Sequence, residues 1–138
     1  MSFVLNPQIE ADSTLVVDLP LCQVRLNHNA AFPWIVLIPR VDKMVELIDL
    51  GAAQQDQVWQ EIRTASHVMK SVYQPDKLNV ANLGNVVAQL HIHVIARFAS
   101  DKAWPGPVWN SGQSASYDSL ILKAEIKKLQ DAFREFAE

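Results

Sequence analysis

The segment Ala88-Gln89-Leu90-His91-Ile92-His93-Val94-Ile95 carries the clearest pattern in this chain of 138 residues. Apolar and polar residues alternate along it, as they do along a β-strand with one buried face. Side chains 88, 90, 92 and 94 are predicted to point into the core, and those of Gln89, His91 and His93 to point to the opposite face. Two histidines therefore lie about 6–7 Å apart on one strand face, beside an amide.

This polar stripe of Gln89, His91 and His93 has three interpretations. The plainest is the solvated face of an edge strand, because polar residues are normal on the outer face of a sheet. The second is a metal site, although structural zinc takes four ligands and catalytic zinc three, and no third ligand stands at a recognisable spacing. The third is catalysis, in which one imidazole attacks a substrate that its neighbours position.

The composition is typical of one globular domain over residues 1–138. Hydrophobic residues make up 49% and charged residues 20%, which excludes a disordered chain. The net charge of −3 leaves no basic surplus for binding nucleic acid. The single cysteine, Cys22, excludes an internal disulfide and fits a reducing compartment. Because no targeting or membrane-spanning segment is evident, we expect a cytoplasmic protein that does not bind membranes.

Five strands are predicted along the chain. They cover Thr14–Asp18, Leu21–Leu26, Trp34–Ile38, Leu78–Leu83 and Val86–Phe98. The first three follow one another through short links, and so do the last two, which favours an antiparallel sheet over an array of parallel βαβ units. The expected fold class is therefore α+β.

Two substantial helices accompany these strands. One follows Gly51, has apolar residues at alternating spacings of four and three, and ends before Pro75. The other covers Tyr117–Glu138 with the same spacing. Shorter helical segments are predicted within Gln8–Ser13 and over Met44–Leu50, the latter with Asp42 as its N-cap.

The segment Gln89–Ile95 also resembles the signature of the histidine triad (HIT) superfamily. That signature is His-φ-His-φ-His-φ-φ, where φ is apolar, and here Gln89 replaces the first histidine. Gly84-Asn85 stands where the family usually has a Gly-Gln pair, and Trp104-Pro105-Gly106 stands where some members carry Trp-Pro.

The resemblance extends to Asn27 and Trp34–Pro39, which are similar to the family's ribose-contacting turn and the strand after it. In all it covers Leu15–Pro107. It implies a HIT-like fold, namely a five-stranded antiparallel sheet with a long helix on it and a C-terminal helix.

The resemblance implies an enzyme, a hydrolase or nucleotidyl transferase that acts on the α-phosphate of a nucleoside phosphoramidate or a dinucleoside polyphosphate. His91 would attack phosphorus and form a covalent nucleotidyl-histidine. His93 would contact the phosphate or the leaving group, and Gln89 would form hydrogen bonds in the same region. No metal or cofactor is implied. The implied partners are a small-molecule nucleotide and a second copy of the chain, since family members are commonly homodimers.

The nucleotide-binding residues that the resemblance implies are Asn27 for the ribose, and Gly84 and Asn85 for the phosphate. A glycine allows the backbone to approach an anion closely. Taken locally, all three residues are equally typical of plain turns. The two tryptophans of the loop 102–112, Trp104 and Trp109, either stack on a base, close a dimer, or cover apolar core.

Two family histidines are absent, because Gln89 replaces the first of the triad and Trp34 stands where several members have a fourth. A second hypothesis is therefore a nucleotide-binding sensor or adaptor with weak or no catalysis. A third is a metal-binding protein that uses His91 and His93.

Overall fold

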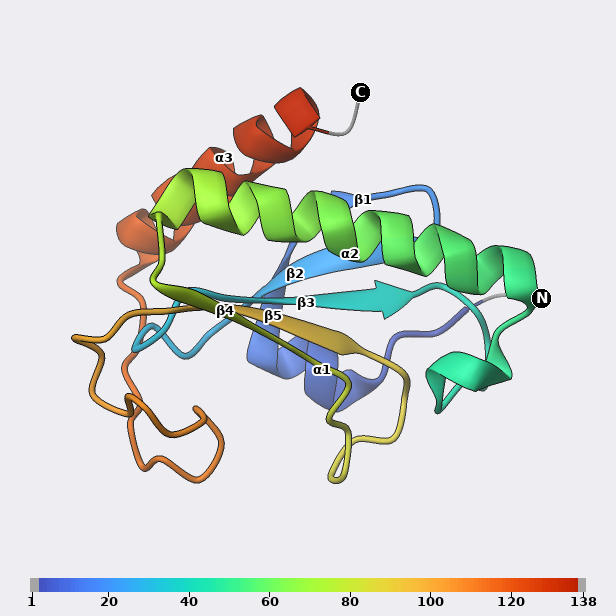
Figure 1. Cartoon of the computed structure of the whole chain (residues 1–138), viewed down its shortest axis with the longest axis horizontal. Helices are drawn as coiled ribbons and strands as arrows, with labels where there is room; N and C mark the ends of the chain where they lie inside the picture. The colour runs from blue at the N-terminus through green and yellow to red at the C-terminus, as the bar shows by residue number, and fades with distance from the viewer. Residues whose placement is uncertain (1–2, 137–138) are drawn as a thin grey trace.

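The computed structural model describes residues 3–136, which form a five-stranded sheet with helices on both faces (Figure 1). The strands lie in the order β1-β2-β3-β5-β4, and every neighbouring pair is antiparallel. Their bounds are β1 Ser13–Asp18, β2 Cys22–Asn27, β3 Trp34–Pro39, β4 Lys77–Ala81 and β5 Ile92–Arg97. The predicted α+β class and five-stranded antiparallel sheet are confirmed.

Three α-helices flank the sheet. Figure 1 shows α2 (Ala52–Tyr73) along one face, with α3 (Ser119–Phe136) packed beside it, and the short α1 (Pro7–Asp12) on the opposite side. As predicted, α2 follows Gly51 and ends at a left-handed residue just before Pro75. None of the helices within residues 3–136 is long and apolar enough to cross a membrane.

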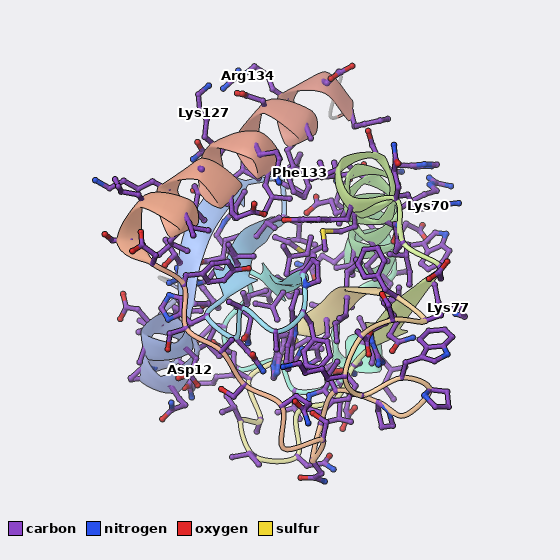
Figure 2. All side chains as sticks on the ribbon, turned by 90° about the vertical axis from the view of Figure 1, so that its left-hand side faces the viewer. Asp12, Lys70, Lys77, Lys127, Phe133 and Arg134 are labelled. Atoms are coloured by element: carbon purple, nitrogen blue, oxygen red, sulfur yellow. The ribbon has the colours of Figure 1, made fainter. Side chains whose placement is uncertain are left out.

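The face of α3 that meets the rest of the protein is set by its apolar stripe. Phe133 is almost completely buried, and Figure 2 shows it directed toward the interior, whereas Lys127 and Arg134 point outward. The helix predicted over Tyr117–Glu138 is confirmed from Ser119 onward, and its last two predicted residues lie outside the described residues.

Both faces of the sheet are covered, and β3 shows this most clearly because all six of its residues are buried. Ile35 and Leu37 belong to the core beneath α2. Trp34 and Val36 belong to a second apolar layer on the α1 side. His93 of β5 lies on that second side and is 6% exposed. Because β5 is an internal strand, the interpretation of the histidine stripe as a solvated edge-strand face is wrong.

The last strand is shorter than predicted. Val86–Phe98 is not one continuous strand, because β5 begins at Ile92, where its pairing with β3 begins. Residues 82–91 form a loop between β4 and β5. As a result Ala88 is exposed instead of facing the core, whereas Leu90 is buried as predicted.

The helix predicted over Met44–Leu50 is also wrong, since only the 3-10 turn Leu47–Asp49 forms there. The Met44 carbonyl accepts a hydrogen bond from the Leu90 amide at 2.9 Å. The Asp49 carboxylate accepts from the amides of residues 45 and 46. These contacts replace helical hydrogen bonds, and residue 46 holds the N-cap position instead of Asp42.

A buried carboxylate on α2 holds the turn between β1 and β2. Glu61 is 3% exposed and accepts hydrogen bonds from the amides of Leu21 at 2.9 Å and Cys22 at 2.7 Å. The Gln57 side chain donates to the same carboxylate at 2.6 Å. Cys22 itself is fully buried, as expected of a small core residue.

Replacing Glu61 with alanine is expected to lower the free energy of unfolding by about 2–4 kcal/mol, because two buried backbone donors lose a charged acceptor. Urea denaturation measures this value. Gln60→Ala, at the neighbouring exposed position of the same helix, is the matched control and is expected to cost less than about 0.5 kcal/mol. Equal losses in the two variants would contradict the role assigned to Glu61.

Candidate active site

The candidate active site is a cleft of about 120 Å³ on the α1 side of the sheet. Its walls come from α1, the strands β2 and β3, and the segment that enters β5. The lining residues are Gln8, Ile9, Asp12, Ser13, Asn27, Val36, Val87, His91 and His93. An adjoining hollow shares Asp12 and Asn27 and is lined further by residues 114–116. The cleft and the adjoining hollow therefore meet on the side of Asn27.

His91 presents one ring nitrogen to this cleft. Its Nδ1 lies 2.7 Å from the backbone carbonyl of Gln89. A carbonyl only accepts, so a neutral His91 carries its proton on Nδ1 and keeps a lone pair on Nε2. Every fully buried side-chain nitrogen or oxygen within residues 3–136 has a partner, and Nε2 has none there. It is therefore open to the cleft, where it can act as a nucleophile.

His93 differs from His91 because protein atoms engage both of its ring nitrogens. The indole Nε1 of Trp34 donates to His93 Nδ1 at 3.0 Å. His93 Nε2 lies 3.0 Å from the carbonyl of Leu83. An indole N–H only donates and a carbonyl only accepts, so the neutral tautomer with the proton on Nε2 satisfies both partners.

The surroundings of His93 also disfavour its protonation. Burial is the main cause that lowers the pKa of His93 to about 4; the Leu83 carbonyl opposes this change and the neighbouring His91 adds to it. The two imidazole rings meet edge-on with their centroids 4.8 Å apart. The predicted contact between His93 and a phosphate stays a prediction, and it would require one of the two hydrogen bonds to break.

Trp109 closes the site over His93. Its ring meets the His93 ring edge-on at 5.0 Å between centroids and the Trp34 ring at 5.8 Å. It packs against the second apolar layer, as expected of a tryptophan that covers core. The loop that carries it is held by Arg97, a 2% exposed cation whose guanidinium binds the Asp101 carboxylate.

The side chain of Gln89 is turned toward the N-terminal segment. Its Oε1 accepts from the Asn6 amide at 2.8 Å, and its Nε2 donates to the Val4 carbonyl at 2.9 Å. Asn6 in turn caps α1 by accepting from the amide of Gln8. The side chain of Gln89 thus holds the helix that forms one wall of the cleft, and only its backbone carbonyl contacts His91.

The structure separates the predicted phosphate-binding pair. Gly84 lies against His91, because a Cβ at this position would stand 2.7 Å from the Val87 carbonyl oxygen and 3.2 Å from Cε1 of His91. Asn85 lines a different hollow, together with Val45. Gly84 therefore belongs to the site by close packing, and phosphate binding by Asn85 stays a prediction without support from this geometry.

The predicted ribose contact, Asn27, does line the cleft. Its Oδ1 accepts from the amide of Asn29 at 2.8 Å, which forms the turn expected of an asparagine at this position. The turn uses the side-chain oxygen, so a ligand would meet the amide nitrogen. The role toward a ribose stays a prediction.

Sequence reasoning missed the contribution of α1. Gln8, Asp12 and Ser13 line the cleft opposite the histidines. The Asn-Pro start of this helix is a local signal for a helix and contains no information on what the helix packs against. Across residues 3–136, no three side chains of His, Cys, Asp or Glu gather closely enough to hold a metal ion.

The HIT domain model matches residues 8–100, and the chain belongs to this family. Family membership places it among nucleotide-binding proteins that include hydrolases and transferases. No curated protein matches the chain significantly.

Similar crystal structures are histidine triad proteins from bacteria. One from Bradyrhizobium japonicum is 39% identical, with a TM-score of 0.93 and coverage of 96% of this chain and 99% of its own. One from Marinobacter aquaeolei VT8 is 35% identical, with a TM-score of 0.94 and 99% coverage of both chains. One from Sinorhizobium meliloti 1021 is 32% identical, with a TM-score of 0.91 and coverage of 94% and 96%. The HIT-like fold is therefore confirmed.

Replacing Gly84 with alanine is expected to displace the His91 ring, because the Val87 carbonyl is backbone and cannot move aside at low cost. The free energy of unfolding should fall by about 1–3 kcal/mol, and the NMR signal of the His91 Cε1 proton should shift. Gly51→Ala meets only an ordinary contact at 3.7 Å and is expected to leave that signal in place. An unshifted signal in Gly84→Ala would exclude the packing role.

Replacing Gln89 with alanine is expected to loosen α1, since two hydrogen bonds to the segment before it are lost. Hydrogen exchange of the Glu10 amide, which donates to the Asn6 carbonyl, should speed up by about 10- to 100-fold at roughly 1 kcal/mol per lost bond. Gln130→Ala removes a comparable bond to the Val16 carbonyl elsewhere and serves as control. An unchanged exchange rate of the Glu10 amide in Gln89→Ala would show that the two hydrogen bonds of Gln89 do not hold α1 in place.

Proposed function

We propose that this protein is a nucleotide hydrolase or nucleotidyl transferase that works through a covalent nucleotidyl intermediate on Nε2 of His91. The observation that supports this most directly is the 2.7 Å contact between His91 Nδ1 and the Gln89 carbonyl, because it leaves the lone pair of Nε2 in the cleft. The proposed substrates are nucleoside phosphoramidates and dinucleoside polyphosphates.

The proposed reaction has two displacements at the α-phosphorus. In the first, the Nε2 lone pair of His91 forms a bond to phosphorus, and the bond to the leaving group breaks with its electron pair on that group. The imidazole becomes cationic, and its Nδ1–H donates more strongly to the Gln89 carbonyl. In the second, water or another acceptor attacks phosphorus, the P–N electron pair returns to Nε2, and the attacking water loses its proton to solvent.

The cleft and the hollow beside it have space for the ribose and the base of the proposed nucleotide. With the α-phosphate at His91, the ribose would lie toward Asn27 and Asp12, and the base toward the adjoining hollow lined by residues 114–116. Gly84 allows the backbone near His91 to approach the phosphate closely.

The proposed assembly is a homodimer with a continuous sheet. β4 is an edge strand in the order β1-β2-β3-β5-β4, and an unpaired edge is a template for pairing with another strand. The apolar side chains of Val80 on this strand and Leu83 just after it are 46% and 37% exposed. Both features fit a second copy of the chain at this edge.

The alternative of a nucleotide-binding sensor with weak or no catalysis is favoured by one observation. Gln89, Trp34 and His93 are all engaged in hydrogen bonds to protein atoms. Of the triad positions, His91 alone keeps a ring nitrogen for a ligand. The neighbours of His91 are thus occupied by protein atoms, as a sensor with weak or no catalysis would allow, and any catalysis would depend on His91.

A covalent intermediate can be trapped by quenching the protein in acid-free denaturant during turnover of diadenosine triphosphate and by analysing the peptides by mass spectrometry. We expect an adenylyl group on His91, and a fall in turnover of about 10³-fold or more in His91→Ala. His67→Ala, at an exposed position of α2, is the control and should keep full activity.

Two results would contradict the proposed enzyme. Equal turnover by the parent protein and His91→Ala would exclude His91 as the nucleophile. Saturable nucleotide binding without an adduct and without turnover would instead support the sensor.

A further inference from the structure

The bond between Trp34 and His93 restricts the protonation of His93. Nδ1 can gain a proton only if the Trp34 N–H moves away, because two N–H donors cannot face each other. Movement is hindered since Trp34 is 7% exposed and its ring is flanked by Trp109 at 5.8 Å. The Leu83 carbonyl at Nε2 is satisfied by the neutral ring. Both contacts therefore select the same neutral tautomer.

The charged and titratable groups around His93 offer no alternative stabilisation of a cation. Those that face it within residues 3–136 are His91 beside it, Asp12 across the cleft, Arg25 on β2 in register with Val36, and Arg97 further along β5 with its partner Asp101. Three of these five groups are cationic or become so on protonation. Neither carboxylate bonds to a His93 nitrogen, since Asp12 accepts from Gln8 and Asp101 from Arg97.

We propose that His93 stays a neutral imidazole over the working pH range, that Trp34 is the positioning residue that keeps it neutral, and that the enzyme consequently favours substrates whose leaving group departs without a proton. Such leaving groups are the phosphate oxygens of dinucleoside polyphosphates, as opposed to the amines of phosphoramidates. This inference rests on the proposed function of His91 and names the substrate class for it.

The chemical reason is the fate of the electron pair in the first displacement. When the P–O bond of a polyphosphate breaks, the pair stays on a phosphate oxygen, which is stable as an anion at neutral pH. When a P–N bond breaks, the pair stays on nitrogen, and the amine must gain a proton as it leaves. His93 lines the cleft beside His91, so a cationic His93 that exchanged the Leu83 carbonyl for the leaving group could donate that proton. A neutral imidazole is a far weaker acid. General acid catalysis contributes about 10²- to 10⁴-fold in rate.

The state of His93 can be measured without any reaction. Nitrogen-15 NMR of labelled protein is expected to show His93 with one protonated nitrogen, Nε2, and one unprotonated nitrogen, Nδ1, unchanged between pH 8 and about pH 5, in keeping with the lowered pKa. An imidazolium spectrum for His93 above pH 5.5, or a proton on Nδ1 of the neutral ring, would overturn the assignment. This measurement needs only the parent protein.

The role of Trp34 is tested with two matched variants. Trp34→Phe keeps an aromatic ring and removes the N–H, so the titration midpoint of His93 should rise, while its burial keeps the midpoint below the ordinary value for histidine, about 6.5. Trp109→Phe alters a ring that touches His93 without a hydrogen bond and should leave the tautomer unchanged. Equal changes in both variants, or none in Trp34→Phe, would exclude Trp34 as the positioning residue.

The substrate preference is tested with diadenosine triphosphate and adenosine 5′-phosphoramidate, which deliver the same adenylyl group. Their kcat/KM values differ only in steps up to the release of the leaving group. We expect the triphosphate to be favoured by about 10²-fold or more at pH 7. At pH 6 the ratio of kcat/KM for the triphosphate to kcat/KM for the phosphoramidate should be at least tenfold smaller in Trp34→Phe than in the parent protein.

These experiments distinguish a failure of the leaving-group preference from a failure of the proposed function of His91. Equal kcat/KM for both substrates, with an adenylyl group on His91, would overturn the leaving-group preference and keep the proposed function. Turnover of neither substrate and no adduct would overturn the proposed function and the preference with it, and the NMR titration would then decide the assignment of His93 by itself.

Discussion

Pairing between β3 and β5 at the centre of the sheet fixes where the aromatic side chains of the site meet. Val36 lies opposite His93, and Trp34 lies opposite Ile95, so the indole and the imidazole are diagonal neighbours on one sheet face. Diagonal neighbours of this kind are within reach of long aromatic side chains, and here they meet at 3.0 Å. α1 and the loop after β5 cover this contact and exclude water from it. A hydrogen bond is stronger in such a low-dielectric interior than it is in water.

The elements that local periodicity specifies were predictable from the sequence. The continuous apolar run Trp34–Ile38 and the spacing of the apolar residues after Gly51 each describe a segment whose burial does not depend on distant contacts. The start of β5 was not predictable, since residues 88–91 alternate like a strand but pair with no other strand. The absence of a helix over Met44–Leu50 was not predictable either, because the Met44 carbonyl accepts a hydrogen bond from the amide of Leu90, which is far away in the sequence.

In the candidate site, too, the features set by local sequence were predictable and those set by distant contacts were not. The proximity of His91 and His93 follows from their separation by one residue, even though His91 lies just ahead of the strand and not within it. The direction of the Gln89 side chain depends on Val4 and Asn6, more than 80 positions away. No local pattern contains that contact. The resemblance to the HIT signature implied a role for Gln89 beside His91, whereas in the structure its side chain forms hydrogen bonds with the N-terminal segment.

That attachment makes the N-terminal segment part of the cleft wall, and this has a practical side for anyone handling the protein. A purification tag joined ahead of residue 3 would continue from the segment whose Val4 and Asn6 form hydrogen bonds with Gln89, next to the α1 wall of the candidate cleft. α3 lies on the opposite face of the sheet (Figure 1), so a tag added after it keeps clear of the cleft. The C-terminal end is therefore the safer position for a tag when ligand affinity is to be measured.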